Sequence, residues 1–231
     1  MKNPFDFFGK TYCINLEERT DRWKSCLSKF EKYQIDNVER IDGVKKYISS
    51  TRKINGRYGC TASWEKTLRK IVDNDIESAL VLEDDFEFRF KKDYIFEKVN
   101  NCISELPNDW DMLYLGGILI DTEFKPPIKI YSKNLYKLMS SYSTHSIAVS
   151  NKGANKILNY FKKDWTNSVI ECCDVIDVFF TRKIIPYCNC FISNELLCTQ
   201  EKSNSDIQEK FVDIQRYMLN VFEEQKNKIE S

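Results

Sequence analysis

The sequence predicts an α/β fold in which a mostly parallel central sheet is flanked by helices, and three observations lead to this prediction. Short β-favouring runs alternate with longer amphipathic stretches along the first half of the chain. The run 78–82 has no polar alternation, as expected of a strand that is buried on both faces. The 231 residues can bury a full core, and no linker or repeat divides them, so residues 1–231 are interpreted as one domain.

The first half of the chain follows a β-α-β-α-β order. Its short apolar runs are predicted strands and its amphipathic stretches are predicted helices. In chain order these are strand 11–16, helix 20–33, strand 38–41, a polar loop over 45–56, helix 58–73 and strand 78–82. Thr20 or Asp21 can cap the first helix, because short polar side chains accept hydrogen bonds from the free N–H groups of a first turn.

The second half has more β structure, and a small β-rich insert is expected near its start. In chain order the predictions are helix 94–106, strand 110–117, β-favouring segments 129–139 and 144–150, a helix from 153 capped by Ser150, helix 171–183, strands at 184–185 and 191–192, and helix 208–228. The last helix carries a sparse apolar stripe. We interpret it as a packing element that can also support a homodimer.

Three carboxylates, those of Glu83, Asp84 and Asp85, follow the strand 78–82 directly. Like charges this close repel one another strongly unless a cation lies between them. Carboxylate oxygens suit a hard divalent cation such as Mg²⁺ or Mn²⁺, and ligands of open α/β sheets bind at the carboxyl ends of the strands. The residues therefore indicate a cation site, and the alternative is a solvated acidic turn.

The composition disfavours several classes of function. Lys plus Arg and Asp plus Glu both total 35, so the net charge of zero gives no electrostatic reason to bind nucleic acid or an anionic membrane. The nine cysteines lack framework spacing and His145 is the only histidine, which favours buried thiols over a disulfide scaffold or structural zinc. No segment reaches the ~18 apolar residues of a membrane span, and the amino-terminal residues do not form a signal peptide. We therefore expect a cytoplasmic protein with no membrane span.

Seven separated motifs occur in the order in which they occur in one known family. They are Ile14-Asn15-Leu16 with Arg19 and Arg22; Gly59-Cys60 with Ser63; Leu82-Glu83-Asp84-Asp85; Trp110-Asp111 with Leu113-Tyr114-Leu115-Gly116; Thr144-His145 leading to Ser150-Asn151-Lys152-Gly153-Ala154; Ile176-Asp177-Val178-Phe179; and Gln200 with Ser205-Asp206-Ile207-Gln208. Together they cover about residues 11–208 and resemble glycosyltransferase family 25. That family includes bacterial lipooligosaccharide galactosyltransferases and the collagen hydroxylysine galactosyltransferase domain.

The resemblance implies a GT-A fold, in which a Rossmann-like sheet binds a nucleotide sugar. It also implies transfer of galactose or glucose from a UDP-sugar, with inversion, to a hydroxyl of a glycan or a hydroxylysine. A metal ion, Mn²⁺ or Mg²⁺, is expected on Asp85, with Glu83 as its second ligand. Which of Glu83 and Asp84 contacts the metal and which contacts the ribose stays open. Two places depart from the family: Trp64 follows Ser63 where a histidine is usual, and Val175-Ile176 precede Asp177 where a proline is often found.

The donor nucleotide is expected at the end of the first strand. Backbone groups of Ile14, Asn15 and Leu16 can pair with the edge of the base, and Arg19 or Arg22 can reach a phosphate, although both arginines can equally be surface charges. Further predicted donor contacts are Asp42, Gly116, Gln200 and Asp206, of which Gly116 is equally typical of a tight turn.

An inverting transfer also needs a general base for the acceptor hydroxyl. Asp177 is the first candidate, because a carboxylate within an apolar run needs a partner or a function. His145 is the second candidate, because imidazole titrates near neutral pH. A structural hydrogen-bonding role is the alternative for each.

Two other functions compete with the glycosyltransferase. A binding module can keep the fold and lose catalysis, and the replacement of the family histidine by Trp64 keeps this alternative open. A metal-dependent phosphotransferase or hydrolase has less support, because the sequence has neither a Walker-type glycine loop nor a cluster of histidines.

Overall fold

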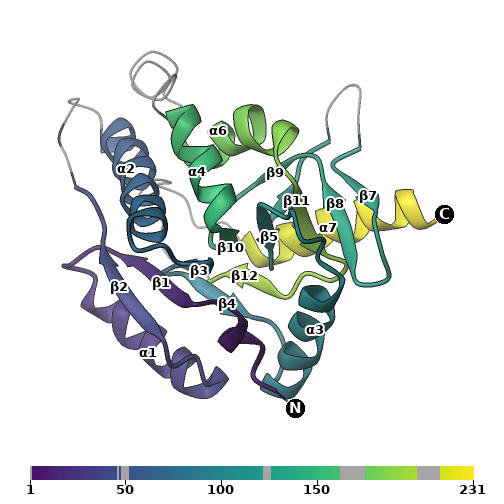
Figure 1. Ribbon diagram of the computed structural model, residues 1–231, viewed down its shortest axis with the longest axis horizontal. Helices are drawn as coiled ribbons and strands as arrows, with labels where there is room; N and C mark the ends of the chain where they lie inside the picture. The colour runs from purple at the N-terminus through teal and green to yellow at the C-terminus, as the bar shows by residue number, and fades with distance from the viewer. Residues whose placement is uncertain (1, 46, 48–51, 122–125, 162–174, 202–213) are drawn as a thin grey trace.

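The computed structural model of the chain describes residues 2–45, 47, 52–121, 126–161, 175–201 and 214–231. Its centre is an eight-stranded sheet with the order β2-β1-β3-β10-β5-β11-β8-β7 (Figure 1). The strands are β1 (Lys10–Asn15), β2 (Val38–Asp42), β3 (Ser78–Glu83), β5 (Met112–Tyr114), β7 (Ile128–Ile130), β8 (Leu135–Leu138), β10 (Ser146–Ser150) and β11 (Cys190–Ser193). Only β8 and β10 run against the common direction. The predicted α/β class with a mostly parallel sheet is confirmed.

The amino-terminal half of the sheet is Rossmann-like. Strand β1 lies between β2 and β3 and is parallel to both. Helix α1 (Thr20–Tyr33) connects β1 to β2, and α2 (Arg52–Asp73) leads from β2 towards β3. The antiparallel strand β10 then joins β3 to β5 and the second half of the sheet. This is the GT-A-like arrangement that the resemblance implies, and it brings the carboxyl ends of β1, β2 and β3 to one edge.

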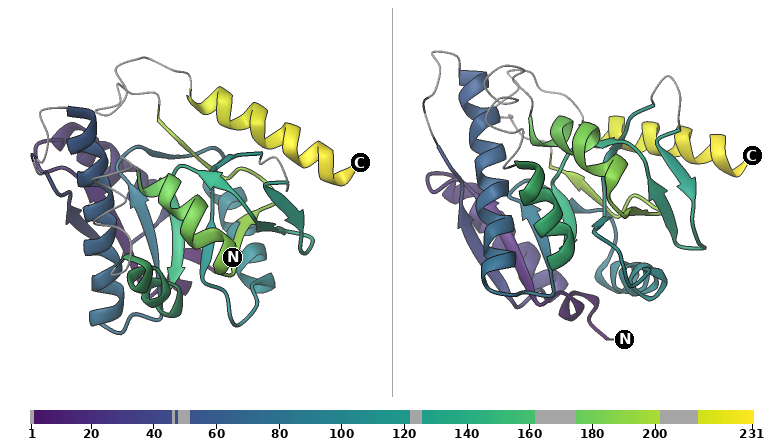
Figure 2. Two further views of the ribbon diagram at one scale, coloured as in Figure 1. Left: turned by 90° about the horizontal axis from the view of Figure 1, so that it is seen from above. Right: turned by 45° about the horizontal axis from the view of Figure 1, so that its top comes forward.

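Helices cover both faces of the sheet, as Figures 1 and 2 show. Helix α2 shares one core with α4 (Asn151–Tyr160), α6 (Ile176–Phe179) and α7 (Ile214–Glu230), whereas α1 and α3 (Lys92–Glu105) share the other. Along β3, Ala79 and Val81 belong to the first core, and Leu80 and Leu82 belong to the second. The unbroken apolar run of this strand follows from burial on both faces.

Two short ribbons connect distant parts of the chain. One pairs β4 (Phe86–Phe88) with β12 (Cys198–Gln200), and the other pairs β6 (Ile118–Leu119) with β9 (Ser141–Tyr142). A short 3-10 helix at Pro4–Phe7 precedes β1. Neither ribbon was predicted, because strands of two or three residues are too short to show an alternation of polar and apolar side chains.

The structure corrects three predictions about local structure. Helix α2 begins at Arg52, inside the predicted loop. The sequence prediction missed this first part of the helix, because residues 54–58 are half-buried and do not form a clear apolar stripe. Neither Thr20 nor Asp21 caps α1, since Arg19 occupies the cap position without a side-chain hydrogen bond and Asp21 pairs with Arg19. Residues 184–185 lie in the helical turns after α6, not in a strand; a short apolar run suits either structure.

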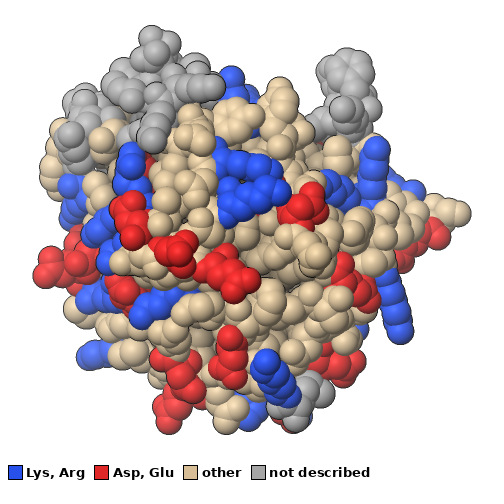
Figure 3. All heavy atoms as spheres, in the orientation of Figure 1, with Lys and Arg blue, Asp and Glu red and all other residues tan. Residues whose placement is uncertain are grey.

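The apolar stripe of the last helix packs within the chain. Met218 and Phe222 on α7 are fully buried, so the part of the stripe that the structure describes is already covered and does not support a homodimer. Residues 208–213 of the predicted helix, together with Asp206, lie outside the described residues. Among the described helices, none is long and apolar enough to cross a membrane. On the face seen in Figure 3, basic and acidic side chains are interspersed, in keeping with the net charge of zero.

Candidate active site

The three consecutive acids lie at the carboxyl edge of the sheet, as the sequence predicts. Glu83 is the last residue of β3 and is in register with Ile14 on β1. The backbone N–H of Asp84 donates to the carbonyl oxygen of Ile14 at 3.1 Å, and that of Glu83 donates to the carbonyl oxygen of His145 at 3.0 Å. The backbone at the end of β3 is therefore fixed on both sides, and the three side chains point into different surroundings.

Asp84 is a structural anchor. One carboxylate oxygen accepts a hydrogen bond from Asn15 Nδ2 at 2.6 Å, and the other accepts one from Arg22 Nη1 at 2.6 Å. The side chains of Asp84 and Arg22 are only 11% and 12% exposed, so this ion pair is largely desolvated. Both carboxylate oxygens are occupied by residues of β1 and α1. Asp84 is thus better placed to hold these elements together than to bind a metal.

Asp85 has one occupied and one open carboxylate oxygen. Its Oδ2 accepts a hydrogen bond from Gln200 Nε2 at 3.2 Å and lies 3.9 Å from Arg22 Nη1. Its Oδ1 is buried and has no hydrogen-bond partner among the described residues. Burial raises the pKa of Asp85 to about 6, although the positive charge of Arg22 opposes this shift. A buried carboxylate oxygen without a donor is unfavourable unless a cation or another partner occupies the site.

The ribbon of β4 and β12 brings Gln200 to Asp85. Gln200 is in register with Phe86, and the backbone N–H of Glu201 donates to the carbonyl oxygen of Asp85 at 2.6 Å. Lys29 on α1 ties the ribbon down, because its buried Nζ donates to the carbonyl oxygen of Phe86 at 2.6 Å and pairs with the Glu201 carboxylate. Gln200 thereby completes the surroundings of Asp85, although the two residues lie 115 positions apart in the sequence.

Glu83 is held by two donors from different elements. Its Oε1 accepts hydrogen bonds from Trp64 Nε1 at 3.0 Å and from Thr144 Oγ1 at 2.6 Å. Burial, together with the negative charge of Asp85, raises the pKa of Glu83 to about 7. The residue that departs from the family pattern thus supplies an indole N–H donor to the acidic motif.

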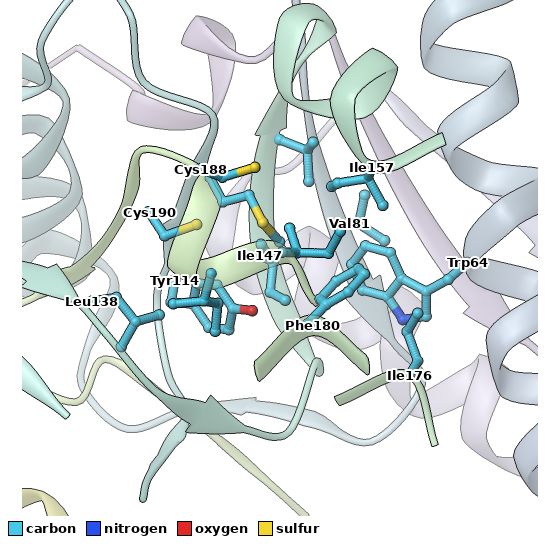
Figure 4. Close-up of a cluster of buried hydrophobic side chains, with 14 of the residues drawn as sticks. Trp64, Val81, Tyr114, Leu138, Ile147, Ile157, Ile176, Phe180, Cys188 and Cys190 are labelled. Carbon is cyan, nitrogen blue, oxygen red and sulfur yellow. The ribbon is translucent and has the colours of Figure 1, made fainter. Parts of the chain in front are cut away.

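The position of Trp64 is set by the core behind it. Its ring is fully buried and packs edge-on against Phe180, with 5.4 Å between the ring centroids. Figure 4 shows Trp64 beside Phe180 and Ile176, which come from the helical segment that also carries Asp177. Because Trp64 links this segment to Glu83, it fixes α6 relative to the end of β3.

His145 is fully buried between two partners. Its Nδ1 lies 2.7 Å from Ser143 Oγ, and its Nε2 lies 3.2 Å from the carbonyl oxygen of Cys198. Burial lowers its pKa to about 4, so the ring is neutral at physiological pH. A Cβ at Gly116 would lie 1.9 Å from that carbonyl oxygen and 2.9 Å from His145 Nε2. Gly116 therefore makes room for this contact, and its proposed role next to the donor stays a prediction.

Asp177 lies in the first turn of α6 and faces the segment before β10. Its Oδ2 accepts a hydrogen bond from the backbone N–H of Ser143 at 3.2 Å, and its Oδ1 accepts one from the N–H of Val178 at 2.7 Å. Ser143 Oγ lies 3.1 Å from Gln200 Oε1, and Gln200 Nε2 donates to Asp85 Oδ2 at 3.2 Å. Asp177 and the acidic motif are therefore joined through Ser143 and Gln200.

The predicted nucleotide contacts lie at the same edge, with differing partners. Leu16 and Asn15 are held by Arg40, whose Nη2 donates to the Leu16 carbonyl oxygen at 3.2 Å and to Asn15 Oδ1 at 2.5 Å. Asp42 is exposed and in register with Asn15. Arg19 forms a two-point contact with the Asp21 carboxylate, both distances being 3.1 Å, whereas Arg22 pairs with Asp84 of the acidic motif.

Sequence reasoning missed Ser143, Thr144 and Arg40 as site residues. Arg40 also stacks on Trp23, with its guanidinium carbon 5.1 Å from the ring centroid. Thr144 appears in the family motif without an assigned role, and the alternation of β2 gives no reason to single out Arg40. Ser143 has φ of 72°, a backbone conformation that the sequence could have signalled only by a glycine.

The described residues fit a metal ion only in part. They contain no group of three His, Cys, Asp or Glu side chains arranged to hold one. The open Oδ1 of Asp85 and the neighbouring Glu83 carboxylate are nevertheless oxygen ligands of the kind that Mn²⁺ and Mg²⁺ prefer. Such a pair fits an ion whose remaining ligands come from water or from the phosphates of a substrate.

Comparison with known proteins identifies the family. The sequence model of glycosyltransferase family 25 (LPS biosynthesis protein) matches residues 8–175. Human procollagen galactosyltransferase 2 is 27% identical over 175 residues, which are 65% of this chain and 27% of that protein. Procollagen galactosyltransferase 1 of Danio rerio is 28% identical over 178 residues, or 65% of this chain and 28% of that protein. The chain thus spans less than a third of the length of these relatives.

The solved structures that the chain matches are more distant. A mannose-1-phosphate geranyltransferase from Thermus thermophilus has a TM-score of 0.43 and 7% identity, with 80% of this chain and 58% of that chain covered. A glycosyltransferase involved in the glycosylation of the major capsid of PBCV-1 has a TM-score of 0.37 and 10% identity, with 96% and 98% covered. The assignment rests on the family match, which covers well over half of the chain. The chain belongs to glycosyltransferase family 25.

Proposed function

We propose that the chain transfers a hexose, galactose or glucose, from a UDP-sugar to a hydroxyl of a glycan or a hydroxylysine, with inversion and with the help of Mn²⁺ or Mg²⁺. Relatives that are named procollagen galactosyltransferases favour galactose. The observation that carries the proposal is a linked pair of carboxylates. Asp85, with its open buried oxygen, is connected through Gln200 and Ser143 to Asp177.

The donor nucleotide is proposed to lie at the carboxyl ends of β1 and β2, where ligands of open α/β sheets bind. Arg40 fixes the backbone and side chain at Asn15 and Leu16, and the exposed Asp42 lies alongside in the register of the sheet. Arg22 adds a positive charge beside Asp85, where the diphosphate of a donor would bring further negative charge. These groups support a nucleotide diphosphate rather than a neutral sugar at this end of the site.

The acidic motif is proposed to hold the metal through Asp85 and Glu83. Asp84 is unsuited to this role, because both of its oxygens already accept short hydrogen bonds. Trp64 and Thr144 hold the Glu83 carboxylate in place next to Asp85. A divalent ion bound here would neutralise the negative charge that develops on the UDP leaving group.

Asp177 is proposed as the general base. The acceptor oxygen attacks C1 of the sugar, the bond from C1 to the phosphate oxygen breaks, and UDP leaves with the bonding electrons. The proton of the acceptor hydroxyl passes to the Asp177 carboxylate. Asp177 is favoured over His145, because the imidazole is fully buried with both nitrogens engaged, whereas Asp177 is half-buried and each of its carboxylate oxygens can accept a second hydrogen bond.

Ligand binding and turnover test the proposal together. We expect UDP with Mn²⁺ to raise the unfolding temperature of the wild-type chain, because a ligand that binds only the folded state stabilises it. UDP-galactose or UDP-glucose is expected to release UDP in the presence of Mn²⁺ and not in the presence of EDTA. Asp85→Asn is expected to abolish this metal-dependent release.

An exposed acid supplies the control. Asp73→Asn, at the end of α2, removes one carboxylate outside the site and is expected to leave UDP release unchanged. If UDP with Mn²⁺ does not shift the unfolding temperature, the proposed donor site is wrong. Binding without any release of UDP, with acceptor glycans and hydroxylysine peptides also supplied, would indicate a binding module instead of the proposed transferase.

A further inference from the structure

Ser143 adopts an unusual backbone conformation next to the proposed base. Its φ of 72° lies in the left-handed region, which is unfavourable for residues other than glycine. The other two described non-glycine residues with positive φ are Gln34 and Asp75, which follow the ends of α1 and α2 and are exposed. Ser143 is the one that is buried, at 8% exposure, so its strained backbone is held by its surroundings.

Three elements meet at Ser143. Its backbone N–H donates to Asp177 Oδ2 on α6 at 3.2 Å. Its hydroxyl oxygen lies 2.7 Å from His145 Nδ1 and 3.1 Å from Gln200 Oε1. Gln200 in turn donates from Nε2 to Asp85 Oδ2 at 3.2 Å. One residue therefore joins the carboxylate proposed to bind the metal to the carboxylate proposed as the base.

The partners of the imidazole determine which way these hydrogen bonds run. The carbonyl oxygen of Cys198 can only accept, so His145 Nε2 carries the ring proton, and Nδ1 accepts from the Ser143 hydroxyl. Gln200 donates to the Asp85 carboxylate from Nε2, which turns its Oε1 towards the same hydroxyl. The single hydroxyl proton is therefore shared between two acceptors, His145 Nδ1 and Gln200 Oε1, in a three-centre hydrogen bond.

We propose that Ser143 is a positioning residue that sets the separation of Asp85 and Asp177, with His145 as its buried support. This inference rests on the proposed function, because it assigns Ser143 to the spacing between the donor side and the acceptor side of that site. The hydroxyl fixes the left-handed turn between β9 and β10, and the turn presents its N–H to Asp177. Loss of the Ser143 hydroxyl keeps the carboxylates of Asp85 and Asp177 but removes the hydrogen bond to Gln200 that connects them.

Glycine and alanine variants of Ser143 separate a positioning role from a role in folding. Ser143→Gly removes the hydroxyl and also relieves the left-handed backbone, so we expect it to unfold within a few degrees of the wild type. The assay uses whichever of UDP-galactose and UDP-glucose the wild type hydrolyses faster. With this donor, the kcat of Ser143→Gly for Mn²⁺-dependent release of UDP is expected to fall at least 10-fold. The KM for that donor is expected to stay within 3-fold, because Asn15, Leu16 and Arg22 are untouched. Ser143→Ala is expected to show the same fall in kcat.

Matched controls use the other two strained positions. Gln34→Gly and Asp75→Gly relieve the same backbone conformation outside the site, and both are expected to keep the wild-type kcat. Gln200→Ala cuts the same link from the other side. The double variant Ser143→Ala with Gln200→Ala is therefore expected to lose no more activity than the more impaired single variant, since two changes in one link are not additive.

The possible results distinguish the two proposals. A folded wild type that releases UDP from neither donor, with acceptor glycans and hydroxylysine peptides also supplied, overturns the proposed function, and the role of Ser143 with it. An active wild type whose Ser143→Gly and Ser143→Ala variants keep kcat within 2-fold overturns only the role of Ser143. Multiplicative losses in the double variant also overturn it, because Ser143 and Gln200 would then act separately.

Discussion

Replacing Glu83 by glutamine is expected to stabilise the metal-free protein at pH 8 and to leave its stability nearly unchanged at pH 4. The pKa of Glu83 is raised from 4.5 to about 7, first by burial and then by the charge of Asp85. Below pH 4.5 the carboxyl is protonated in both the folded and the unfolded chain. Between pH 4.5 and about 7 the unfolded chain ionises this carboxyl while the folded chain keeps it protonated, so the free energy of unfolding falls across this window and levels off above it.

The size of the effect follows from the two pKa values. A carboxyl whose pKa rises from 4.5 to about 7 on folding lowers the free energy of unfolding by about 3 kcal/mol between pH 4 and pH 8. Glutamine keeps the shape and stays neutral, and its oxygen can still accept from Trp64 and Thr144. For a chain of this size, about 3 kcal/mol corresponds to a rise in unfolding temperature of roughly 6–12 °C.

Thermal unfolding of both proteins in EDTA from pH 4 to pH 8 measures this difference. The gain from Glu83→Gln is expected to shrink in an Asp85→Asn background, because the negative charge of Asp85 that helps to raise the pKa of Glu83 is then absent. Glu39→Gln is a control of opposite sign, since a hydrogen bond from Lys70 lowers the pKa of Glu39 and the variant loses stability at pH 8. A Glu83→Gln gain that does not depend on pH would refute the reasoning.

Three further predictions concern the anchors and the base of the site. Asp177→Asn is expected to lower kcat for transfer by roughly 10²–10⁴-fold with little change in donor KM, and a variant that keeps kcat within roughly 3-fold of the wild type would contradict the role as base. Arg22→Met is expected to lower the free energy of unfolding, measured in urea, by about 3–5 kcal/mol, because it leaves the buried Asp84 carboxylate without its cation. A decrease of less than about 1 kcal/mol would show that water reaches Asp84. Gly116→Ala and Gly153→Ala are both expected to cost about 1–3 kcal/mol, since the added Cβ would lie 1.9 Å from the Cys198 oxygen and 2.3 Å from the Asp111 oxygen. Only Gly116→Ala is expected to lower kcat as well, and equal kcat values for the two would separate Gly116 from the site.

The sheet and the location of the acids could be predicted from the sequence. Burial on both faces of β3 requires an unbroken apolar run, which can be recognised in the sequence. The three carboxylates that follow this run mark the edge of the sheet where the strand ends. The different surroundings of Glu83, Asp84 and Asp85 were not readable. They depend on Trp64, Arg22 and Gln200, which reach the acids only through tertiary packing.

Ser143 shows a second limit of the sequence. Left-handed backbone is usually signalled by glycine, and a serine at such a position gives no local sign of its conformation. Its partners Asp177, His145 and Gln200 were each singled out, but nothing in their spacing showed that one residue would join them. The departure of Trp64 from the family pattern was visible as a difference, whereas its contact with Glu83 required the structure.

The ribbon of β4 and β12 has a consequence for synthesis of the protein. The hydrogen bond between Gln200 and Asp85 spans 115 residues of sequence, whereas that between Asn15 and Asp84 spans 69. A growing chain on the ribosome can therefore form the Rossmann-like half and anchor Asp84 long before Gln200 emerges. Until then Asp85 lacks its partner on β12 and His145 lacks the Cys198 carbonyl group. The carboxylates of the site thus reach their final arrangement only after residue 200 has emerged, and a chain truncated before residue 198 is expected to keep the proposed nucleotide end of the site without the contacts of Gln200 and Cys198.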